Sequence, residues 1–235
     1  MLYRPFGKTG WNISAIGMGT WNIGNQWGEI DEATAWAALR AAYDAGMNLF
    51  DTAESYGIPN GLSEERLGRA LAGIRHQVYV ISKIGHWGKR TGGAVPKTSV
   101  DLIRLCCHAS LGRLGTDWLD VVLCHEGDIA DPSVYLEAFE VLKQRGRIRA
   151  YGISTNDLAV LERFNAHGTC GVVEVDYSLL NRAPEAGLLP YCVEHGIAVL
   201  VRGPLRKGLL SGKYDADSVF TDTVRTESAR AGNER

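Results

Sequence analysis

Short runs of nearly continuous apolar residues recur along this chain, each followed by a polar residue and then by an amphipathic stretch. Continuous apolar runs indicate parallel strands covered on both faces, because a strand with one solvated face would alternate apolar and polar residues. The repetition shows no break in composition, which predicts a single parallel α/β domain over residues 1–235. The seven expected strands are Ile13–Met18, Met47–Phe50, Val78–Ile81, Trp118–Cys124, Ile148–Ile153, Val172–Val175 and Ala198–Val201.

The amphipathic segments between these runs are expected to form helices. Asp31 and the Asn156-Asp157 pair are suited to cap helix N-termini, and Pro132 after Asp131 is suited to the first helical position. Before the first run, a Gly-Lys-Thr-Gly turn within Tyr3–Asn12 predicts a small hairpin that could plug the bottom of a barrel. The expected helices are Ala33–Ala45, one beginning at Ser63, Val100–Leu114, Asp131 to about Gln144, one opening at Asn156, and Pro184–Glu194.

Composition excludes several classes of protein. Hydrophobic residues make up 45% of the chain and the formal net charge is -2, which argues against a disordered protein and against a basic nucleic-acid binder. No signal peptide is expected at the N-terminus, and no apolar stretch is long enough for a membrane span. The five cysteines have no Cys-x-x-Cys spacing and are expected to be reduced in a cytoplasmic protein. The six histidines show no metal-ligand spacing, so no metal site is expected.

Two architectures fit the alternation, a doubly wound sheet and a (β/α) barrel. Gly17-Met18-Gly19 has no third glycine at dinucleotide-binding spacing, which makes it a weak signal for the first. In a barrel, the polar residues that follow the strands all point into one catalytic mouth. Those residues are Asp51, Lys83, His125 and Ser154, and Tyr56 lies on the loop that follows Asp51.

This set of side chains is suited to protonating a carbonyl oxygen. The charge of Lys83 is expected to lower the pKa of the Tyr56 phenol, while Asp51 orients the lysine and His125 hydrogen-bonds the substrate oxygen. Each residue alone also has a structural interpretation: a turn cap, a surface lysine, a structural histidine and a packed loop aromatic. Four such residues at successive strand ends favour catalysis.

Four blocks, taken in order, resemble the aldo-keto reductase family. The resemblance runs from the first residues to about Tyr214. The blocks are Asn48–Gly57 followed by Ser63-Glu64, Gly152–Asn156, Val175–Arg182 and Gly203–Tyr214.

The resemblance implies a TIM-type (β/α)8 barrel and NADPH-dependent reduction of an aldehyde or ketone to an alcohol. It carries the family's catalytic tetrad onto Asp51, Tyr56, Lys83 and His125, with Tyr56 as proton donor. The implied partner is a small carbonyl substrate, with no nucleic acid and no membrane. The cofactor NADPH/NADP+ would be held by residues that the family places along its binding path: Gly19, Thr20, Trp21, Asp51, Ser154, Glu174, Tyr177, Arg202, Gly203, Leu205 and Lys207.

Three departures from the family pattern qualify these expectations. Glu174 stands where glutamine is usual, and Gly203 stands where serine is usual. Seven strands are found where closure needs eight, so the eighth strand and its helix are expected to be missing, and the polar stretch Thr221–Arg235 is expected to be a mobile loop. Two alternative functions therefore stay open: a cofactor-sensing regulatory protein, like the related potassium-channel β subunits, or an inactive truncated member.

Overall fold

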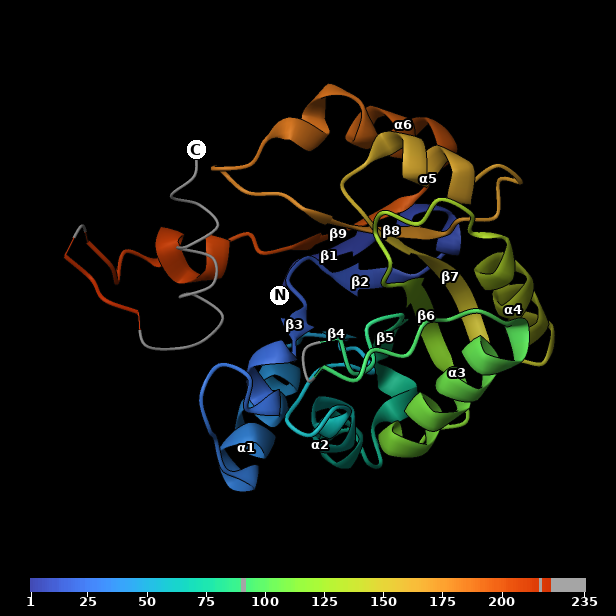
Figure 1. Cartoon of the computed structure of the whole chain (residues 1–235). Helices are drawn as coiled ribbons and strands as arrows, with labels where there is room; N and C mark the ends of the chain where they lie inside the picture. Colours follow the sequence, from blue (N-terminus) through green and yellow to red (C-terminus); the bar gives the residue numbers. More distant parts are fainter. Residues whose placement is uncertain (90–91, 216, 221–235) are drawn as a thin grey trace.

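The computed structural model describes residues 1–89, 92–215 and 217–220, and its main element is a curled sheet of parallel strands. Within these residues the sheet has seven strands, each hydrogen-bonded to the next along the chain, and helices cover its outer face (Figure 1). This order confirms the barrel-type α/β fold, with seven of its strands among the described residues. The strands are β3 (Met18–Gly19), β4 (Leu49–Asp51), β5 (Tyr79–Ile84), β6 (Leu119–Cys124), β7 (Ile148–Ser154), β8 (Val172–Asp176) and β9 (Ala198–Arg202).

The N-terminal residues form the expected hairpin. Strand β1 (Tyr3–Pro5) pairs antiparallel with β2 (Asn12–Ser14) around a short 3-10 turn. Phe6, which precedes that turn, and Ile13 of β2 enter an inner cluster with Leu49, Ile81 and Val172. The expectation of one strand over Ile13–Met18 is wrong. The run is divided between β2 and β3, because the chain must leave the antiparallel hairpin before it joins the parallel sheet.

Among the described residues, six α-helices lie close to their expected positions: α1 (Glu32–Asp44), α2 (Leu62–Ala70), α3 (Val100–Leu114), α4 (Ser133–Gln144), α5 (Leu158–Phe164) and α6 (Leu188–His195). Asp31 and Asp157 are confirmed as caps, since their side chains accept hydrogen bonds from backbone amides in the first turns of α1 and α5. Pro132 precedes α4 as its cap residue instead of occupying the first helical position. The segment expected as one helix over Pro184–Glu194 is divided at Gly187, where a 3-10 turn gives way to α6.

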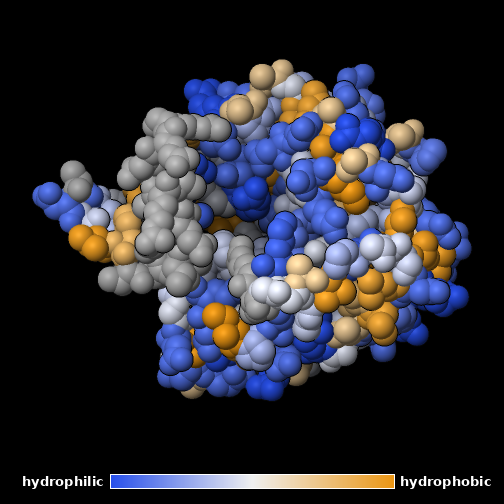
Figure 2. All heavy atoms as spheres, viewed as in Figure 1, coloured by the Kyte–Doolittle hydropathy of each residue, from blue (hydrophilic) through white to orange (hydrophobic). Residues whose placement is uncertain are grey.

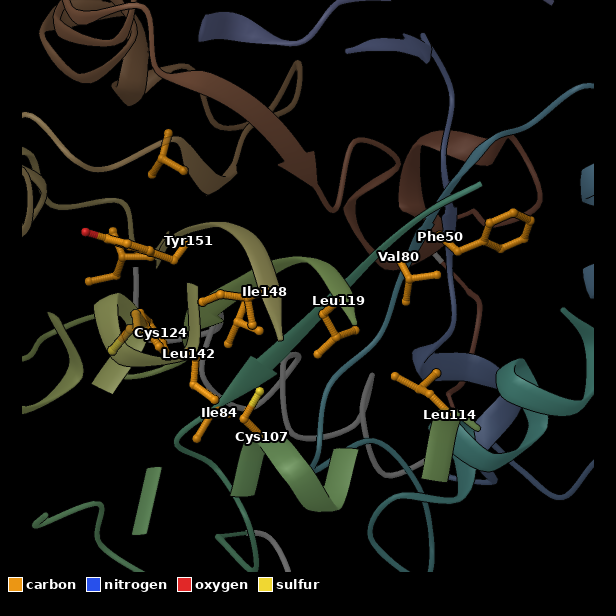
Figure 3. Close-up of a cluster of buried hydrophobic side chains, with 14 of the residues drawn as sticks. Phe50, Val80, Ile84, Cys107, Leu114, Leu119, Cys124, Leu142, Ile148 and Tyr151 are labelled. Carbon is orange, nitrogen blue, oxygen red and sulfur yellow. The ribbon is translucent and has the colours of Figure 1, made fainter. Parts of the chain in front are cut away.

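The outer core lies between the sheet and the helices. Phe50, Val80 and Leu119 point outward from neighbouring strands and join Leu114 of α3 and Leu142 of α4 in a single apolar cluster (Figure 3). All five side chains are at most 4% exposed. Burial of a leucine or phenylalanine side chain stabilises a fold by about 1.5–3 kcal/mol, so this cluster anchors the helices against the sheet.

The inner face of the sheet changes from apolar to charged along the strand direction. Side chains on a strand return to the same face every second residue. The positions two residues beyond the inner-cluster members of β4, β5 and β8 are Asp51, Lys83 and Glu174. The strand period therefore places three ionisable side chains in one layer above an apolar floor.

Other sequence expectations concern thiols and membrane segments. All five cysteines are free, and four of them are buried. No helix among the described residues has the length and apolar character needed to cross a bilayer. The loop expected over 221–235 lies outside the described residues.

Candidate active site

Lys83 lies at the centre of the charged layer. Its Nζ donates to both Asp51 carboxylate oxygens at 2.6 and 2.7 Å, to the backbone oxygen of Thr52 at 3.0 Å and to the Tyr56 hydroxyl at 3.3 Å. The lysine side chain is 0% exposed, and the Asp51 side chain is 17% exposed. A fully buried ammonium needs such partners, because an unpaired buried charge is strongly destabilising.

Burial has the largest effect on the pKa values of Tyr56 and Asp51. Burial raises the pKa of Tyr56 to about 12, and the opposing effect of the Lys83 charge is smaller. The expectation that Lys83 gives Tyr56 a lowered pKa is therefore wrong for the net shift, although the direction of the lysine's own effect is correct. Asp51 is likewise shifted, since burial raises its pKa to about 7 against the attraction of Lys83. The neighbouring carboxylates hold the pKa of Lys83 above its usual range, despite its burial.

His125 follows β6 and lies beside Tyr56, with the two ring centroids 6.0 Å apart in an edge-to-face arrangement. The structure thus brings all four expected catalytic residues together. It also adds His86, whose ring stacks on His125 at 4.0 Å. His86 was not predicted, because it lies in the loop after β5, three residues beyond Lys83, where no sequence pattern marks it.

Aromatic side chains form a wall next to Tyr56. Trp21 stacks on the Tyr56 ring with centroids 5.8 Å apart, and Trp27 meets Trp21 edge-on at 5.1 Å. Trp87 instead packs on the Arg113 guanidinium, at 4.9 Å. Trp21 therefore covers the phenol directly, and Trp27 extends the wall through its contact with Trp21.

The loop after β5 is held by a buried ion pair that sequence reasoning missed. Glu54 Oε1 accepts from the backbone amides of Gly85 and Trp87 at 2.8 and 3.3 Å, and it lies 3.3 Å from Lys97 Nζ. The side chains of Glu54 and Lys97 are 1% and 0% exposed. Because His86 lies between the two anchored amides, this pair fixes the backbone that presents it.

Glu174 joins the same site, although its placement beside the lysine was not expected. Its Oε1 is 3.5 Å from Lys83 Nζ, and its Oε2 is buried with no hydrogen-bond partner among the described residues. A signal was present in the sequence, because Glu174 interrupts the otherwise apolar run Val172–Val175. Ser154, its register partner on β7, is also buried. Buried Oε2 and the adjacent hydroxyl fit a ligand that brings hydrogen-bond donors, such as a nicotinamide carboxamide.

The other expected cofactor residues lie near the carboxyl ends of the strands. Thr20 is buried and its amide donates to the Asp51 carbonyl at 2.9 Å, which sets the loop of Gly19 and Trp21 next to the tetrad. Tyr177 donates to Glu185 at 2.6 Å. The segment with Gly203, Leu205 and Lys207 is exposed after β9.

Arg202 and Arg206 both approach Asp176, at 3.9 and 3.1 Å. Their side chains are about half exposed, so these cations stand at the surface, at the end of β9 and just beyond it. Figure 2 shows a recess near the centre of the view, rimmed largely by hydrophilic residues.

Known proteins share this fold and sequence. The profile of the Aldo/keto reductase family matches residues 15–233. The chain is 35% identical over 234 residues to an NADH-specific methylglyoxal reductase of Escherichia coli, covering 92% of this chain and 71% of that protein. The holo form of aldo-keto reductase AKR11C1 from Bacillus halodurans superposes with a TM-score of 0.84 at 34% identity, covering 94% and 72% of the two chains.

A Klebsiella pneumoniae aldo-keto reductase solved in complex with NADPH gives a TM-score of 0.74 at 33% identity, covering 98% of this chain and 78% of that one. These matches, together with the curled parallel sheet, define the class of protein as an oxidoreductase. This chain belongs to the aldo/keto reductase family.

Proposed function

We propose that this protein reduces an aldehyde or ketone to an alcohol with NADPH, and that Tyr56 donates the proton. The observation that carries the proposal is the 3.3 Å contact between the buried Tyr56 hydroxyl and Lys83 Nζ, with Asp51 on the same ammonium. When bound, the nicotinamide cofactor supplies a hydride to the carbonyl carbon. The chain's own residues must then place the carbonyl oxygen and deliver one proton to it.

Tyr56 suits that task. A phenol with a pKa of about 12 is fully protonated near neutral pH, so the proton is present before the substrate arrives. The adjacent ammonium stabilises the phenolate that remains after transfer, which lowers the barrier to giving the proton up. His125 lies beside the phenol and is placed to hydrogen-bond the same oxygen, so that two groups orient the carbonyl.

For the cofactor, we propose that Ser154 and Glu174 hold the carboxamide and Tyr177 stacks on the ring. Arg202, Gly203, Leu205 and Lys207 would follow the phosphates, and Gly19, Thr20 and Trp21 would line the first loop. The exposed guanidinium of Arg202 supports an anionic ligand at this end of the sheet. The relatives include both an NADH-specific enzyme and a complex with NADPH, so the choice of NADPH is part of the proposal.

The test is a titration of the purified protein with NADPH and with NADH, followed by turnover assays on a panel of aldehydes and ketones. The panel includes methylglyoxal, since one relative is named for it. We expect tighter binding of NADPH and consumption of the cofactor with at least one carbonyl compound. Binding without turnover would instead favour a cofactor-responsive regulatory protein, and no binding of either cofactor would refute the proposal.

A further inference from the structure

The catalytic lysine is shared by two carboxylates. Lys83 Nζ lies 2.6 Å from Asp51 Oδ1 and 3.5 Å from Glu174 Oε1. The Lys83 and Glu174 side chains are 0% and 2% exposed, so water screens their charges very little. Asp51, Lys83 and Glu174 are called the charged cluster below.

The charged cluster has one negative charge too many. Two ionised carboxylates and one ammonium sum to one net negative charge, and neutral Tyr56 adds none. Arg202 also acts on Asp51, but its side chain is about half exposed and it also interacts with Asp176. His125 meets the Tyr56 ring edge-on, with the centroids 6.0 Å apart. A buried, uncompensated charge is destabilising, so the cluster favours holding one additional proton.

The proposed reaction brings a second source of positive charge to this position. Hydride transfer requires the nicotinamide ring to lie within a few ångströms of a carbonyl whose oxygen touches Tyr56. That ring is neutral when reduced and cationic when oxidised. The oxidised ring can therefore replace the additional proton, because either positive charge neutralises the excess carboxylate charge.

We propose that the charged cluster holds one more proton beside reduced nicotinamide than beside oxidised nicotinamide, and that Glu174 is the residue that creates this difference. The inference rests on the proposed function, since it requires the cofactor to bind at this site. Without the Glu174 charge, Asp51 and Lys83 would form a neutral pair with no proton to release. Burial and the charge of Glu174 both raise the pKa of Asp51, to about 7, which places the exchange near neutral pH.

The test counts protons during binding. Calorimetric titrations with NADP+ and with NADPH, each run at pH 7 in buffers of different ionisation enthalpy, give the number of protons exchanged with solvent. In the wild type we expect NADP+ to release roughly 0.5–1 proton more than NADPH does. In Glu174→Gln we expect that difference to fall to below about 0.2 proton. Glu137→Gln, an exposed change on α4, is the matched control and should behave as wild type.

A second measurement uses only the wild-type protein and therefore does not depend on the folding of a variant. Because binding of NADP+ releases a proton, a higher pH strengthens the binding of NADP+ relative to that of NADPH. The ratio of the NADPH and NADP+ affinities should therefore fall as pH rises from 6 to 8, by up to about tenfold per unit.

The outcomes separate the two proposals. Equal proton release by the two cofactor forms, or a difference that Glu174→Gln leaves unchanged, overturns the role of Glu174 while the proposed function stands. A ratio of affinities that is independent of pH does the same. Failure of both cofactor forms to bind overturns the proposed function, and this inference with it.

Discussion

Tyr56 differs from an exposed tyrosine because its hydroxyl is enclosed and its nearest charged neighbour is an ammonium group. We expect Tyr56→Phe to lower the rate of carbonyl reduction by ~10²–10⁴-fold, because general acid catalysis is worth about that much. Cofactor affinity should be nearly unchanged, since only one hydroxyl is removed. Steady-state kinetics and fluorescence titration measure the two quantities.

The matched control is Tyr43→Phe, which removes a hydroxyl that donates to Gln77 on the outer surface. Its activity should equal that of the wild type. Turnover by Tyr56→Phe within a few-fold of the wild-type rate would show that another group donates the proton.

Lys83 affects both the chemistry and the fold. We expect Lys83→Met to abolish measurable reduction and to decrease the free energy of unfolding by about 3–5 kcal/mol, because two buried carboxylates lose their shared partner. Denaturant unfolding measures the stability change. Lys143→Met, an exposed change on α4, should alter neither property.

The pH dependence of reduction also depends on these two residues. Reduction needs protonated Tyr56, and a pKa raised to about 12 places the loss of that proton far above neutral pH. The rate should therefore show no decline from Tyr56 ionisation between pH 7 and pH 10. The Lys83 charge lowers the pKa of Tyr56, so in any residually active Lys83 variant the decline should move to still higher pH. The contrary result would be a reduction rate that declines with an apparent pKa between 7 and 10 in the wild type but not in Tyr56→Phe. That result would mean that burial does not raise the pKa of Tyr56.

At the scale of elements, the centre of the sheet leaves no room for a side chain at one position. A Cβ on Gly152 of β7 would lie 1.6 Å from the Val172 carbonyl oxygen of β8. We expect Gly152→Ala to separate these strands and to destabilise the protein by at least about 3 kcal/mol, the upper part of the usual range for overpacking. Circular dichroism during thermal unfolding provides the measurement.

Gly112→Ala is the comparison for that change. Gly112 lies inside α3, and a Cβ there would meet nothing within 4 Å. This substitution should stabilise the protein by roughly 0.5–1 kcal/mol, because alanine is a better helix former than glycine. Equal effects of the two substitutions would mean that strands β7 and β8 can move apart without loss.

The strands and helices were largely predictable because their signals are local. Continuous apolar runs located six of the seven sheet strands, and side chains such as Asp31 and Asp157 marked helix starts through capping hydrogen bonds. The division of Ile13–Met18 was missed because apolar periodicity does not show where a chain changes sheets. The break at Gly187 was missed because a 3-10 turn and an α-helix share a similar apolar pattern.

The site was predictable only in part, because local sequence patterns do not show which distant residues meet. Asp51, Lys83 and His125 follow apolar runs in the sequence, which indicates that they meet at one mouth. The Glu174–Lys83 contact and the Glu54–Lys97 pair connect distant segments, and no local pattern specifies which buried acid meets which lysine. The net direction of the Tyr56 pKa shift required knowledge of enclosure, which outweighs the lysine charge.

At the scale of the whole molecule, the N-terminal hairpin is held against elements near residues 168–198. The Lys8 amide donates to the Gly196 carbonyl at 2.8 Å, and Lys8 Nζ donates to the Gly168 carbonyl at 2.8 Å. A Cβ on Gly7 would lie 2.5 Å from the Ala198 amide nitrogen. The hairpin therefore sits tightly on the start of β9.

We expect Gly7→Ala to push the hairpin away from β9 and to lower the unfolding free energy by about 1–3 kcal/mol more than Gly10→Ala does. Both glycines have positive φ, but a Cβ on Gly10 would meet nothing within 4 Å, so the comparison isolates the steric contact. Urea unfolding of the two variants measures it. Identical midpoints would show that the contact with Ala198 does not constrain the hairpin.

The docking of this hairpin also affects how the protein is made. Phe6 and Ile13 leave the ribosome well before two of their apolar neighbours, Val172 and Ala198. At translation rates of 5–20 residues per second, they wait roughly 10–40 s before those partners are synthesised. During that time these apolar side chains of the nascent chain lack their final neighbours, and the inner cluster is completed only when β9 emerges.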